Sequence, residues 1–93
     1  MKKSVSKKAK KVRFQLTTEP GSQVFVAGTF NAWDATKHPL SATPDSVLHQ
    51  ATLEIPPGRH EYKFVVNGEW RMDPECTDWA PNGHGSLNNV LMI

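Results

Sequence analysis

Residues 62–72 read Tyr-Lys-Phe-Val-Val-Asn-Gly-Glu-Trp-Arg-Met. The dipeptide Asn67-Gly68 stands between two runs of β-favouring residues, which is the strongest short signal for a hairpin with a two-residue type I′ turn. Such a turn places Val65 directly opposite Trp70 on the next strand. The sequence therefore predicts a β-hairpin of defined register, around which the other strands are organised.

Alternation along this hairpin separates a core face from an outer face. Side chains on a strand point alternately to its two sides, so the bulky Tyr62 and Phe64 mark the core face. Lys63, Val65 and Trp70 then fall on the opposite face, with Lys63 diagonal to Trp70 at roughly 7–8 Å between Cα atoms. An outward tryptophan beside a lysine predicts a binding surface.

The two-residue period recurs along the rest of the chain. Further strands are expected at residues 12–16, 24–27, 47–55 and 86–93. His49 is the one polar residue on the apolar side of the third of these segments, which includes Val47. Residues 29–34 and 73–85 are expected to be loops, and long loops in compact domains are more often functional than idle.

About seven short strands separated by turn residues are typical of an antiparallel β-sandwich of immunoglobulin-like architecture. The hairpin from Lys63 to Met72 is expected near one edge of it. Cys76 is the only cysteine, so the sandwich has no internal disulfide, and a cytoplasmic location is expected. The chain also shows no apolar run that predicts a signal peptide or a transmembrane helix.

Charge divides the chain into a tail and a body. Seven of the eleven basic residues lie at positions 2–13, and from Phe14 onward the balance is four minus nine, or −5. This argues against nucleic-acid binding by the folded domain. Residues 1–10 are expected to be a disordered, lysine-rich tail, either a solvated arm or a segment that contacts polyanions. Residues 11–93 are expected to form one domain.

Four blocks of sequence carry a resemblance to a known family. They are Val-Phe-Val-Ala-Gly-Thr-Phe-Asn-Ala-Trp (24–33), Leu-Glu-Ile-Pro-Pro-Gly-Arg-His-Glu-Tyr-Lys-Phe-Val-Val-Asn-Gly-Glu-Trp (53–70), Asp-Pro (73–74) and Gly-Ser-Leu-Asn-Asn-Val (85–90). In order and spacing they resemble the glycogen-binding domain of the AMP-activated protein kinase β subunit. The same sandwich resembles the early-set domains that precede the catalytic barrels of isoamylases and glycogen branching enzymes. The resemblance extends from Val12 to the end of the chain.

The resemblance implies a set of carbohydrate-binding residues. Carried over position by position, it implies Trp33 and Trp70 as stacking platforms for α-glucan, Lys63 and Asn88 as the hydrogen-bonding pair, and Ser86 as a further contact. This agrees with the chemistry of glucose, whose apolar C–H faces and belt of hydroxyls require flat aromatic rings flanked by donors and acceptors.

His84 is the sixth candidate contact with the glucan, and it is also a departure from the family pattern. The family has a leucine here that enters the centre of the bound glucan helix. The resemblance therefore implies contact with a single glucan chain and leaves the wrapping of a multi-turn glucan open.

Structural alternatives exist for several of these residues. Trp33 could be a plug over one end of the sandwich, and Lys63 could be an ordinary solvated strand lysine. Trp79, close to Pro81, is expected to anchor its loop. Asn88 and Asn89 alternate, so one of the two faces outward.

Catalysis is not expected from this sequence. A glycosidase needs two carboxylates set across a sugar site, whereas Asp73, Glu75 and Asp78 are acidic residues of a loop. The histidines show no metal-ligand spacing, and no cofactor motif is present. The predicted function is non-catalytic binding of intracellular α-1,4-linked glucan, such as glycogen or maltooligosaccharides. The alternative is a structural or protein-interaction sandwich that partners a kinase or a glucan-processing enzyme.

Overall fold

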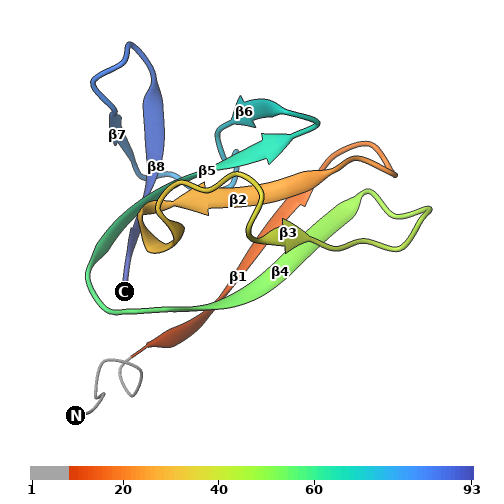
Figure 1. Ribbon diagram of the computed structural model, residues 1–93, viewed down its shortest axis with the longest axis horizontal. Coiled ribbons are helices and arrows are strands. Elements are labelled where there is room, and N and C mark those ends of the chain that lie inside the picture. The colour runs from red at the N-terminus through yellow and green to blue at the C-terminus, as the bar shows by residue number, and fades with distance from the viewer. Residues whose placement is uncertain (1–8) are drawn as a thin grey trace.

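The computed structural model describes residues 9–93, which form two antiparallel sheets packed face to face (Figure 1). The elements are β1 (Lys10–Thr17), β2 (Val24–Gly28), the 3-10 helix η1 (Thr29–Asn31), β3 (Pro39–Leu40), β4 (Leu48–Ile55), β5 (Arg59–Val66), β6 (Glu69–Arg71), β7 (Trp79–Pro81) and β8 (Leu87–Met92). One sheet pairs β1 with β4. The larger sheet has the order β3-β2-β5-β8-β7, and β6 also pairs with β5. The predicted all-β sandwich is confirmed.

The β5–β6 hairpin has the predicted register. Val65 pairs with Trp70 across the hairpin, and Val66 pairs with Glu69. Asn67 and Gly68 have φ angles of 50° and 86°, as a type I′ turn requires. The expectation that the hairpin lies near a sheet edge holds only for the short β6, because β5 is hydrogen-bonded to β2 on one side and to β8 and β6 on the other.

The core lies between the two sheets and follows the predicted alternation. Its buried hydrophobic side chains are Phe14, Leu16, Val24, Val26, Leu40, Ile55, Tyr62, Phe64 and Val66. The Tyr62 ring meets Phe14 edge to face, with 5.1 Å between ring centroids. Its hydroxyl donates to Asp73 Oδ2 at 2.7 Å. Burial and this hydrogen bond to a carboxylate both raise the pKa of Tyr62.

Two strand boundaries differ from the sequence-based expectation. Of the predicted tail, residues 1–8 lie outside the described residues, and Lys10 already belongs to β1, where it pairs with Ile55. Val47 lies before β4 rather than in it, and its side chain is exposed. His49 is buried as the alternation predicts, and its Nδ1 atom lies 3.0 Å from the Val47 carbonyl oxygen.

The predicted loop 73–85 contains a strand, β7, which pairs with β8 to form a hairpin that extends beyond the rest of the sandwich (Figure 1). Proline is tolerated at Pro81 because β7 is an edge strand. Trp79 does not anchor a loop by burial, since its side chain is 58% exposed. Among residues 9–93, no helix has the length and apolar character needed to cross a membrane.

Candidate functional site

An open cavity of about 620 Å³ lies on the outer face of the larger sheet, opposite the core. It is bounded by the turn after η1, by β5 and β6, and by the β7–β8 hairpin. The lining residues are Thr29, Trp33, Glu61, Lys63, Trp70, Pro81, Asn82, His84 and Asn88. Five of the six residues predicted from sequence are therefore brought together in one place. The sixth, Ser86, contacts Lys63.

Trp33 is held in the cavity by a tightly constrained turn. The side chain of the buried Asn31 accepts the Gly28 N–H at 3.0 Å and donates to the Val26 carbonyl at 3.0 Å. Ala32 and Trp33 follow with φ angles of 57° and 60°. Left-handed backbone in a residue other than glycine costs about 1–3 kcal/mol and persists where the surroundings impose it, often at functional sites.

The two tryptophan rings lie next to each other at the edge of the cavity. The ring centroids of Trp33 and Trp70 lie 6.3 Å apart, with the planes tilted by 50°. Trp70 is 48% exposed and Trp33 is half-buried. Two flat apolar rings at an angle, both bordering open space, can cover the faces of a ring-shaped ligand. Both residues line the cavity, and neither belongs to the core between the sheets.

A lysine that points outward from a strand is usually exposed to solvent, but Lys63 is not. It is only 9% exposed, because β2 flanks it on one side, where it pairs with Ala27, and the β7–β8 hairpin encloses it on the other. Its Nζ atom donates to Ser86 Oγ at 3.0 Å. An ammonium has three N–H donors, so two remain for a ligand in the cavity.

Of the two neighbouring asparagines, Asn88 faces the cavity and Asn89 faces inward. Asn89 is fully buried, and its Oδ1 atom accepts the Asp73 N–H at 2.7 Å. Asn82 shapes the loop that carries the exposed His84, because its Oδ1 atom accepts the His84 N–H at 2.8 Å.

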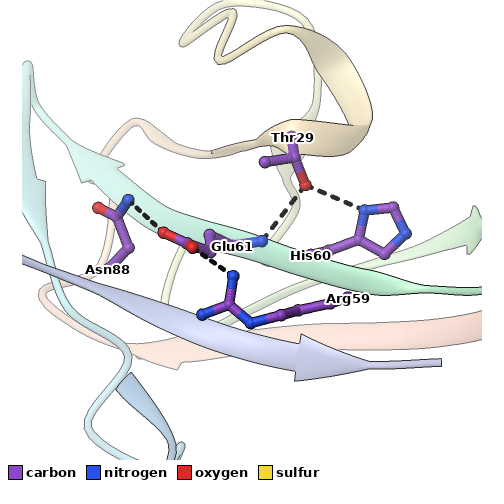
Figure 2. A network of polar contacts seen from close by, with 5 residues as sticks. All are labelled: Thr29, Arg59, His60, Glu61 and Asn88. Atoms are coloured by element: carbon purple, nitrogen blue, oxygen red, sulfur yellow. Dashed lines mark hydrogen bonds and ion pairs between the residues drawn. The ribbon is translucent and has the colours of Figure 1, made fainter. Parts of the chain in front are cut away.

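Glu61 was not identified from sequence, although it lies on the same face as Lys63 by simple alternation. Figure 2 shows its carboxylate between Asn88 and Arg59. Oε1 accepts a hydrogen bond from Asn88 Nδ2 at 2.9 Å, and Oε2 accepts one from Arg59 Nη1 at 2.6 Å. The bonds from Asn88 and Arg59 lower the pKa of Glu61, which keeps it ionised at neutral pH.

A second set of bonds in Figure 2 ties η1 to β5. His60 Nε2 lies 2.8 Å from the Pro56 carbonyl, which only accepts, so Nε2 carries the hydrogen. In the neutral ring Nδ1 then accepts from the Thr29 hydroxyl at 3.0 Å. Thr29 Oγ1 in turn accepts the Glu61 N–H at 3.3 Å. The segment before Trp33 is thus fixed to the strand that carries Lys63.

The family described as the glycogen recognition site of AMP-activated protein kinase matches residues 11–93. The chain belongs to this family. It is 37% identical over 76 residues to 5′-AMP-activated protein kinase subunit beta-2 of Mus musculus and of Homo sapiens, and 36% identical over 76 residues to subunit beta-1 of Bos taurus. Each match covers 82% of this chain but only 26–27% of the relative, so the chain spans about a quarter of these proteins. The resemblance inferred from the four sequence blocks is confirmed.

Proposed function

We propose that this member of the glycogen-recognition family binds α-1,4-linked glucan, such as glycogen or maltooligosaccharides, in the cavity and without catalysis. The observation that carries the proposal is the tilted pair of Trp33 and Trp70 rings, 6.3 Å apart, bordering the same cavity as Lys63 and Asn88. Family membership supports the same ligand class.

The chemistry of the cavity matches that of a glucose chain. The tryptophan rings cover the apolar C–H faces, Lys63 supplies N–H donors, and Asn88 and Ser86 supply further polar groups for the hydroxyls. Two ring faces that each remove about 100 Å² of apolar area from water contribute about 5 kcal/mol. Association costs about 4 kcal/mol or more. Hydrogen bonds to Lys63, Asn88 and Ser86 supply the remainder, and with them we expect dissociation constants between micromolar and millimolar that fall as the glucan lengthens.

His84 is proposed to meet a single glucan chain at the edge of the cavity. It lies exposed in the β7–β8 loop and carries a polar, titratable ring where the family has leucine. A polar ring is poorly suited to the apolar interior of a coiled glucan. We therefore propose contact with an extended or singly curved chain.

The absence of catalysis is proposed from the lining of the cavity. Glu61 is the single carboxylate among the lining residues, whereas glycosidases place two carboxyl groups across the scissile bond. Glu61 is also engaged by Asn88 and Arg59 rather than free to exchange a proton with a ligand.

The proposed setting follows from the relatives. They are subunits of a protein kinase, so a kinase or a glucan-processing enzyme is the proposed protein partner. The cytoplasm is the proposed compartment, which agrees with the single cysteine, Cys76, being a free thiol.

The deciding experiment is calorimetric titration with maltose, maltotriose, maltopentaose and maltoheptaose, with cellopentaose as the β-1,4-linked control. We expect affinity to rise with length along the α-linked series and cellopentaose to bind at least tenfold more weakly than maltopentaose. If maltoheptaose does not bind at millimolar concentration and glycogen does not co-sediment with the protein, the glucan proposal is wrong. The protein-interaction role would then take its place.

A further inference from the structure

We propose that Glu61 is a positioning residue that orients the Asn88 side-chain amide so that its oxygen is presented to the sugar. The proposal rests on the proposed glucan site, because it assigns a role within that cavity. Its basis is the 2.9 Å contact between Asn88 Nδ2 and Glu61 Oε1 (Figure 2). Both residues line the same cavity as Trp33 and Trp70.

The charge of Glu61 decides which way the Asn88 amide points. An ionised carboxylate accepts hydrogen bonds and donates none, so it pairs with the amide nitrogen and repels the amide oxygen. The opposite orientation would put two acceptors in contact at the cavity wall. Asn88 Oδ1 is accordingly turned away from Glu61, and Asn82 Nδ2 approaches it at 3.4 Å.

Glu61 is itself held in place by contacts of its side chain and of its backbone. Arg59 Nη1 donates to the second carboxylate oxygen of Glu61 at 2.6 Å. The backbone N–H of Glu61 donates to Thr29 Oγ1, and Glu61 pairs with Val90 of β8 in the sheet. Both carboxylate oxygens are therefore engaged. The group acts through Asn88 rather than by touching the sugar.

The consequence is that the same cavity holds both a donor and an acceptor for hydroxyl groups. Lys63 Nζ offers N–H donors, one of which is taken by Ser86, while Asn88 offers Oδ1 as an acceptor. Each glucose hydroxyl both donates and accepts. Two hydroxyls of one glucose residue can therefore bind at once, the first through its oxygen to Lys63 and the second through its hydrogen to Asn88.

A double-mutant cycle tests this assignment. Dissociation constants for maltoheptaose are measured for the wild type, Glu61→Ala, Asn88→Ala and the double variant. We expect each single variant to bind about 3- to 10-fold more weakly, the scale of one hydrogen bond. Because Glu61 acts through Asn88, the double variant should bind no more weakly than Asn88→Ala alone. Losses that multiply would overturn the proposal, as would an unaffected Glu61→Ala.

Two further variants separate orientation from charge and folding. Glu61→Gln keeps an oxygen that accepts from Asn88 but does not enforce its orientation, so we expect a smaller loss than for Glu61→Ala. Glu69→Gln is the matched control for charge. Like Glu61, Glu69 pairs with an arginine two residues away, in this case Arg71 at 3.4 Å, but it makes no hydrogen bond with Asn88. We therefore expect Glu69→Gln to leave the dissociation constant for maltoheptaose unchanged. An equal loss in Glu69→Gln would overturn the proposal.

A ligand-free measurement keeps the proposal separate from the glucan assignment. In ¹H–¹⁵N spectra, the Asn88 side-chain amide signals should move as Glu61 is titrated with acid, and this movement should be absent in Glu61→Gln. If the wild type binds no glucan but the signals move, the orientation stands and the proposed function fails. If glucan binds and the signals do not move, the role of Glu61 is refuted.

Discussion

Trp70→Ala tests whether the outer tryptophan is a sugar platform. About half of the Trp70 side chain is open to solvent, which for a side chain of roughly 250 Å² leaves about 120 Å² for a ligand. If a glucose ring covers about 100 Å² of it, the lost contact amounts to about 2.5 kcal/mol. We expect the dissociation constant for maltoheptaose to rise by about 70-fold in calorimetric titration. The expected loss of binding free energy lies between about 1 and 3 kcal/mol.

The same substitution should have little effect on folding. All three residues of β6 are exposed, and Trp70 makes no part of the core between the sheets. Chemical denaturation should therefore show a loss of less than about 1 kcal/mol in the free energy of unfolding. Truncation of a buried tryptophan would cost about 3–5 kcal/mol, so the two roles are well separated by measurement.

Trp79→Ala is the matched control. Trp79 belongs to the same sheet and is exposed to a similar degree, but it does not line the cavity. Its removal should leave maltoheptaose binding unchanged. The platform reasoning is refuted if Trp70→Ala changes the dissociation constant by less than twofold, or if Trp79→Ala weakens binding equally.

Three further substitutions probe the scaffold and its pH dependence. Gly28→Ala should lower the free energy of unfolding by about 1–3 kcal/mol, because a Cβ atom there would lie 2.5 Å from the Glu61 carbonyl oxygen; unchanged denaturation would contradict this. Tyr62→Phe should cost about 1–2 kcal/mol of stability by removing a hydrogen bond to Asp73, while calorimetry should show glucan binding intact. The lowered pKa of Glu61 means that its contribution to stability is fully present above its ordinary pKa of about 4.5 and is lost as pH falls through the folded-state value. In melting curves between about pH 7 and pH 2.5, Glu61→Gln should lose this part of the acid dependence, and an unchanged profile would argue against it.

The hairpin was the most predictable part of the fold because its signals are local. The type I′ turn depends on the ability of Asn67 and Gly68 to adopt positive φ. Once the turn is set, pairing of Val65 with Trp70 follows by counting residues. The strand β7 was missed for the opposite reason. It has three residues and ends in a proline, so it is too short to show a period, and it exists only because β8 is available as a partner.

Part of the cavity lining was predictable from sequence, but its environment was not. Alternation and family resemblance together named five of the nine residues that line the cavity. The burial of Lys63 was not predictable, because it depends on β2 and the β7–β8 hairpin closing around it. Glu61 was overlooked because its partner Asn88 is 27 residues away in the chain.

The sequence by itself determined the strand class, the hairpin register and the outward direction of Trp70, since these follow from turn chemistry and from the alternation of side chains along a strand. Only the tertiary structure decided that Trp33 approaches Trp70, that Lys63 is enclosed, and that Glu61 faces Asn88. These contacts join the turn after η1 with β2, β5, β6 and β8, and no local period encodes the distance between side chains on segments that meet only when the sheet assembles.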